Sequence, residues 1–98
     1  MKELTLFFAA ALLCNAIPHL TNGLSGHRFP TPFAKPRGIG RSSALINFLW
    51  GSANVIAGLV ILLPLPAAGF STPELIALLA GALSLGCFMS WHFAKVQD

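Results

Sequence analysis

The chain has 98 residues, enough for one domain, and only 9% of its side chains are charged while 55% are hydrophobic. A soluble globular domain carries about 25% charged residues. An independent soluble enzyme is therefore excluded, because too few polar side chains remain to cover a core. The composition predicts an all-α integral membrane protein in which residues 1–98 form a single membrane domain with three transmembrane helices.

The first apolar run, Leu4–Leu20, is 17 residues long, at the lower end of the roughly 17–25 residues that span a bilayer. It contains Asn15 and Pro18, so a short span, a cleaved signal sequence and a re-entrant segment are all open interpretations. Glu3 offsets the charge of Lys2, and no small-residue cleavage site follows the run. We therefore expect a retained transmembrane helix over about residues 4–20.

The segment from residue 21 to 43 is rich in proline, glycine and basic side chains. Three prolines favour an extended, polyproline-like backbone, and four glycines permit turns. We expect it to be a long loop at the membrane surface, with basic residues at lipid phosphates and two phenylalanines at the headgroup boundary. A loop that binds a partner or gates a ligand is the alternative. The residues of this predicted interfacial loop are Arg28, Phe29, Phe33, Lys35, Arg37 and Arg41.

The second and third spans are expected at about residues 44–65 and 74–94, joined by a short connection over residues 66–73. Ser42 and Ser43 can cap the second helix. The stretch Ser71–Glu74 offers two starts for the third helix, a capping box or a threonine cap followed by proline. The short connection predicts that these two helices form a tight antiparallel hairpin.

The basic side chains indicate an orientation across the membrane. Four basic residues of the 21–43 loop and Lys95 would lie on one side, and only Lys2 on the other. By the positive-inside rule the N-terminus is outside, and the loop and the C-terminus are cytoplasmic. The charge bias and small size suggest a bacterial inner (plasma) membrane. Attraction to anionic lipids accounts for the basic charge, so the bilayer is an expected partner and nucleic acid is not.

Small and polar residues recur along one side of the second helix, at intervals of four, three and four: Asn47, Gly51, Asn54 and Gly58. The third helix has two rows of small residues, Ala77-Gly81-Ser84 and Ala82-Gly86-Ser90. Small residues mark helix contacts in lipid, and buried amides need hydrogen-bond partners. We interpret these rows as packing faces. Two rows on one helix predict an additional partner, either another copy of the chain or another membrane protein.

His19 and His92 are the candidate ligand-binding residues. Each follows a cysteine by five positions, and the first and third helices run in the same direction, so both pairs would lie at similar depth. One hypothesis makes them axial haem ligands, and the other places them at the membrane interface. The chain has no C-x-x-C-H motif and no zinc-like Cys/His spacing. We therefore expect no metal and no cofactor, with haem as the alternative.

The chain lacks known catalytic and nucleotide-binding motifs, so we expect no enzyme. The leading hypothesis is a small, non-catalytic accessory or structural membrane protein, or a homo-oligomer, that acts through helix–helix association. The first alternative is an oligomeric channel or carrier for a small solute, in which Asn47 and Asn54 face an open cavity. The second is a haem-binding or redox component, which requires a cavity bounded by His19 and His92.

Overall fold

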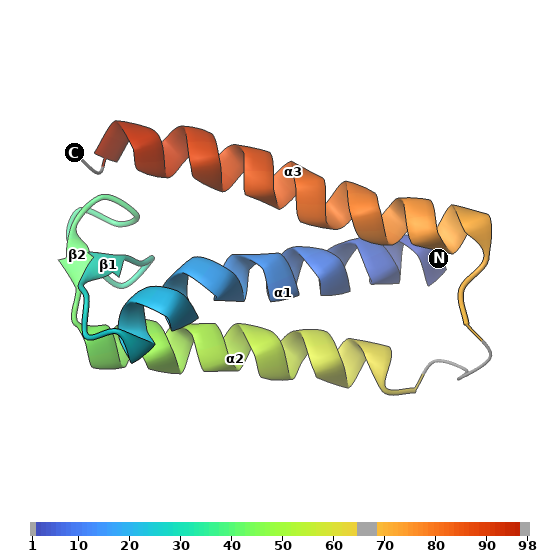
Figure 1. Ribbon diagram of the computed structural model, residues 1–98, viewed down its shortest axis with the longest axis horizontal. Coiled ribbons are helices and arrows are strands. Elements are labelled where there is room, and N and C mark those ends of the chain that lie inside the picture. The colour runs from blue at the N-terminus through green and yellow to red at the C-terminus, as the bar shows by residue number, and fades with distance from the viewer. Residues whose placement is uncertain (1, 65–68, 97–98) are drawn as a thin grey trace.

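The computed structural model describes residues 2–64 and 69–96, which form three helices and one short strand pair (Figure 1). The helices are α1 (Lys2–Leu24), α2 (Ala44–Leu62) and α3 (Thr72–Val96), and the strands are β1 (Phe29–Pro30) and β2 (Arg41–Ser42). Each helix is long and apolar enough to cross a membrane. The 19 residues of α2 alone cover about 28 Å, close to the thickness of a hydrocarbon core. The prediction of three such helices is confirmed.

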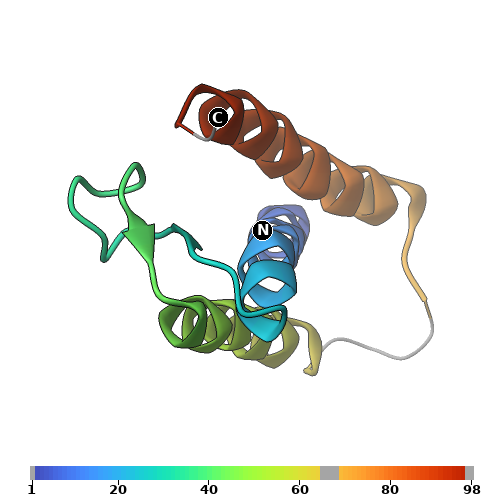
Figure 2. The same cartoon turned by 60° about the vertical axis from the view of Figure 1, so that its left-hand side comes forward.

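Helix α1 lies between the other two helices (Figures 1 and 2). It packs along both of them, whereas α2 and α3 scarcely touch each other. The prediction that the second and third helices form a tight hairpin is therefore wrong: they run antiparallel, but each packs on α1. Part of their predicted connection, residues 65–68, lies outside the described residues.

Glycines explain why α1 occupies the central position. A Cβ atom at Gly51 of α2 would lie 2.8 Å from Leu20 Cγ of α1, and one at Gly58 would be equally close to a leucine side chain of α1. A Cβ atom at Gly81 of α3 would collide with the backbone carbonyl of Phe7. Only a glycine hydrogen fits at this distance, so both outer helices present their closest-approach surfaces to α1.

The predicted caps are confirmed. The Ser43 hydroxyl accepts a hydrogen bond from the Ile46 backbone N–H at 3.2 Å and starts α2. At the start of α3 the Ser71 backbone N–H donates to Glu74 Oε1 at 2.8 Å, and the Glu74 N–H donates to Ser71 Oγ at 3.4 Å. These reciprocal bonds form the capping box, and they satisfy backbone donors that a helix N-terminus leaves unpaired.

Helix α1 continues to Leu24, four residues beyond its predicted end, with Pro18 inside it. A proline removes one backbone donor but does not end a helix whose following turn is held by other contacts. The Asn22 side chain donates to the Pro18 carbonyl at 2.7 Å, and Gly23 packs against the backbone of Phe48 in α2. Packing on α2 thus extends the helix into the segment that its composition predicted to be loop.

The connecting loop (residues 25–43) is more ordered than a polyproline-like segment. Strands β1 and β2 pair antiparallel, with Phe29 opposite Ser42. The hydroxyls of Thr31 and Ser42 lie 2.5 Å apart, and the Thr31 carbonyl accepts the Gly38 N–H at 2.9 Å. These bonds fold the loop against one end of the bundle, called here the loop end, where α1 and α3 end and α2 begins (Figure 2).

Candidate functional site

Polar side chains of α1 and α2 meet in the interior of the bundle. The Asn15 side chain donates from Nδ2 to Asn54 Oδ1 at 3.0 Å. One turn nearer the loop end, His19 Nδ1 lies 2.8 Å from Asn47 Oδ1. Asn47 is fully buried and Asn54 is 3% exposed. The polar members of the predicted stripe therefore face α1. The channel alternative requires both amides to line an open solute path, and within this chain neither of them does.

The surroundings of Asn47 determine which nitrogen of His19 carries the proton. Asn47 Nδ2 lies 2.9 Å from the Phe29 carbonyl oxygen, 3.2 Å from that of Ser42 and 3.0 Å from that of Ser43. Carbonyl oxygens only accept hydrogen bonds, so the amide nitrogen must point at them and Oδ1 must point at His19. The neutral His19 ring therefore donates from Nδ1. Its Nε2 retains a lone pair and has no hydrogen-bond partner among the described residues.

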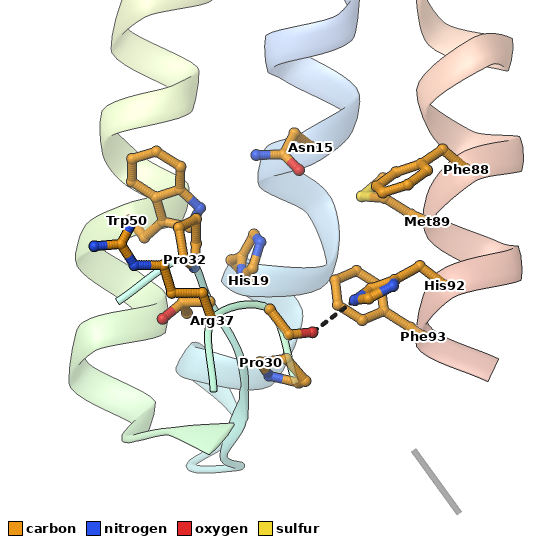
Figure 3. Close-up of a pocket in the computed structure, with 12 residues that line it drawn as sticks. Asn15, His19, Pro30, Pro32, Arg37, Trp50, Phe88, Met89, His92 and Phe93 are labelled. Atoms are coloured by element: carbon orange, nitrogen blue, oxygen red, sulfur yellow. Dashed lines mark hydrogen bonds between the residues drawn. The ribbon is translucent and has the colours of Figure 1, made fainter. Parts of the chain in front are cut away.

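A cavity of about 360 Å³ lies beside this cluster at the loop end (Figure 3). Its walls come from all three helices and the connecting loop, and they are mostly apolar with a few polar groups. The lining residues are Asn15, His19, Pro30, Thr31, Pro32, Arg37, Gly38, Trp50, Phe88, Met89, His92 and Phe93. This combination of an apolar surface and a small number of converging polar groups is typical of a small-molecule site.

His92 ties α3 to the connecting loop at the wall of this cavity. Its Nε2 lies 2.6 Å from the Gly38 carbonyl oxygen, so the ring donates there (Figure 3). Gly38 has φ of +70°, a backbone conformation that side-chain-bearing residues rarely adopt. The ring of His92 also stacks on Phe88, with centroids 5.6 Å apart. The two predicted ligand residues thus line one cavity, and each has one ring nitrogen engaged by the protein.

Metal binding has little support in this arrangement. Across residues 2–64 and 69–96, no three or more His, Cys, Asp or Glu side chains are grouped so that they could hold a metal ion. Both cysteines are free thiols, with Cys87 exposed on the outside of α3. The cavity therefore offers two imidazoles, a guanidinium and an indole N–H, a set that suits hydrogen bonding to a ligand better than metal coordination.

The loop residues that we expected at the membrane surface divide into two groups. Phe29 is the exception to the expectation, because it is only 6% exposed and packs against Phe93 with ring centroids 4.5 Å apart. It belongs to β1, whose two residues are both buried. Phe33 is 63% exposed and contacts Trp50 edge-on. The exposed basic members are Arg28, Lys35, Arg37 and Arg41.

Sequence reasoning missed two groups at this site. Trp50 belongs to no predicted stripe, yet its indole Nε1 is buried and has no hydrogen-bond partner among the described residues. Asn15 was visible only as an amide inside an apolar run, a signal that a polar partner exists but not where. On α3, Gly81 packs on α1, whereas Ser84 of the same row is exposed.

The chain matches no protein-family model, no curated protein and no solved structure. Its function is therefore inferred from its own geometry.

Proposed function

We propose that this protein is a small, non-catalytic integral membrane protein that acts by association with another transmembrane helix, through the row Ala82-Gly86-Ser90 of α3. In this proposal the connecting loop and the C-terminus are cytoplasmic and the N-terminus is outside, in a bacterial inner membrane. The basic side chains of the connecting loop and Lys95 support that orientation, because they gather at the loop end, where Figure 1 also places the C-terminus.

The observation that carries the proposal is Gly86. The other four glycines within helices, at positions 23, 51, 58 and 81, each lie where a Cβ atom would come within 3 Å of a neighbouring helix. At Gly86 the nearest atom is Cys14 Sγ at 3.8 Å, an ordinary van der Waals contact. A glycine in a helix costs about 1 kcal/mol relative to alanine. Packing within the chain does not account for this glycine, whereas close approach of an external helix would.

The surface around Gly86 suits such a partner. It is a shallow hollow lined by Ala82, Leu83, Gly86, Cys87, Ser90 and Trp91. The Ser90 hydroxyl donates to the Gly86 carbonyl at 2.8 Å, so no unpaired polar group has to be covered. Transmembrane helices associate where small residues let their backbones approach closely. The partner is a helix of a second copy or of another membrane protein.

The test replaces Gly86 with leucine in the full-length protein and compares native masses in a mild detergent. The wild type should elute as an assembly and Gly86→Leu as a single chain with unchanged helical circular dichroism. Ser84→Leu is the matched control, because Ser84 is exposed two residues earlier and points away from Gly86. A monomeric wild type would exclude a second copy as the partner, and an assembly unaffected by Gly86→Leu would refute the proposal.

The haem alternative has one observation in its favour, since both imidazoles line one cavity. Against it, His92 Nε2 is already held by the Gly38 carbonyl. An absorbance spectrum of the same purified peak decides between them: a Soret band lost in both His19→Ala and His92→Ala would replace association with a redox role.

A further inference from the structure

The cavity at the loop end contains polar groups that helix association does not use. The indole N–H of Trp50 is buried without an acceptor. His19 is 2% exposed, and its Nε2 has no hydrogen bond among the described residues. A buried donor without an acceptor is destabilising. On the wall of this cavity, the unpaired Trp50 donor calls for an acceptor atom from a ligand or solvent, whereas the lone pair of His19 Nε2 calls for a donor such as water.

The charge at this end of the molecule selects the sign of the ligand. Five cationic residues lie in the connecting loop and at the end of α3, namely Arg28, Lys35, Arg37, Arg41 and Lys95. The carboxylates of the described residues, Glu3 and Glu74, are at the opposite end of the bundle, where Glu74 pairs with Lys2 at 3.2 Å. A cluster of charges of one sign attracts ligands of the opposite sign.

Arg37 brings that charge to the cavity. Its side chain lines the cavity beside Trp50, and it forms no ion pair or hydrogen bond with the part of the chain that the structure describes (Figure 3). A guanidinium presents several N–H donors in a fixed plane that matches the oxygens of a carboxylate or phosphate. Arg37 therefore brings donors for an oxyanion to the cavity wall, beside the unpaired indole of Trp50.

The rest of the wall selects the body of the ligand. Pro30, Pro32, Phe88, Met89 and Phe93 surround the polar groups with apolar surface. A free inorganic anion would gain nothing from these apolar walls, whereas an acyl chain would be buried against them. We propose that this cavity binds an anionic amphiphile from the bilayer, a fatty-acid carboxylate or a lipid phosphate, with its oxyanion at Arg37 and Trp50 and its chain against the aromatic wall.

The chain contains its own reporter for this ligand. Of its two tryptophans, Trp50 lines the cavity, whereas Trp91 is 61% exposed on the outside of α3. The full-length Trp91→Phe protein, in nanodiscs of zwitterionic lipid, therefore reports on Trp50 alone. Dodecanoate and dodecanol are added at matched membrane mole fractions, and inorganic phosphate is added in a separate titration.

We expect a saturable change in Trp50 emission with dodecanoate at a concentration about 10-fold to 100-fold below that needed with dodecanol, since hydrogen bonds to a charged group contribute about 1.5–3 kcal/mol. Arg37→Gln should remove this preference. Lys35→Gln, which removes the same charge from the same loop but lies outside the cavity, should retain it.

Equal responses to acid and alcohol, or equal losses in Arg37→Gln and Lys35→Gln, would overturn the proposal. Displacement of dodecanoate by millimolar phosphate would also overturn it and assign the site to a free oxyanion. Native mass spectrometry gives an independent readout: one dodecanoate per chain supports the site, and an unsaturable series of adducts contradicts it. None of these outcomes depends on whether the α3 surface binds a partner.

Discussion

Replacement of Asn47 by alanine should destabilise the protein far more than the same change at Asn54, although both amides lie in one stripe of α2. Besides the local bonds to the Ser42 and Ser43 carbonyls, Asn47→Ala removes two hydrogen bonds to groups distant in the chain, to His19 and to the Phe29 carbonyl. Each of these two is worth about 0.6 kcal/mol in membrane proteins. It also leaves the His19 N–H without an acceptor in the interior, which costs about 1–3 kcal/mol. The sum is about 2–4 kcal/mol.

Asn54→Ala loses one such bond, to the partly exposed Asn15, since its own Nδ2 is bonded to the Trp50 carbonyl within α2. The expected loss is about 0.5–1 kcal/mol. Both variants remove the same side-chain atoms, so the difference between them isolates the polar network. Equilibrium unfolding with increasing dodecyl sulfate, followed by circular dichroism, measures it. Equal losses to within about 0.5 kcal/mol would show that the network around Asn47 contributes nothing specific.

Three further predictions follow from the packing and from the proposed orientation. Gly81→Ala should destabilise the fold by about 1–3 kcal/mol in the same assay, because the added Cβ meets a backbone carbonyl that cannot rotate away. Gly86→Ala should leave the stability of the single chain unchanged or raise it. The reverse order of stabilities would contradict the packing of α3 on α1. His92→Phe should speed hydrogen exchange of the Gly38 amide by releasing the connecting loop from α3, with unchanged exchange as the contrary result. A reporter protein that is active only in the cytoplasm should be active when it is fused to the C-terminus. Activity of a reporter that works only outside the membrane, fused at the same position, would reverse the proposed orientation.

Local and compositional features of this protein were readable from its sequence. The scarcity of charges and the length of three apolar runs predicted three helices long enough to cross a membrane, because the hydrocarbon core sets a minimum span. The capping box of Ser71 and Glu74 was readable because both partners lie within one helical turn. The stripe of Asn47 and Gly51 was readable because the helical period alone places its members on one side.

Only the tertiary structure decided which helix those surfaces meet and where the cavity lies. Chain order suggested that α2 packs on α3, but the glycines at 51, 58 and 81 all match α1. Arg37 and Trp50, 13 positions apart, come together because the connecting loop folds back over the bundle. Such pairings depend on the shapes of surfaces distant in the chain. The periodicity of one helix identifies its packing side, but only steric fit and hydrogen bonding between helices determine which neighbour occupies it.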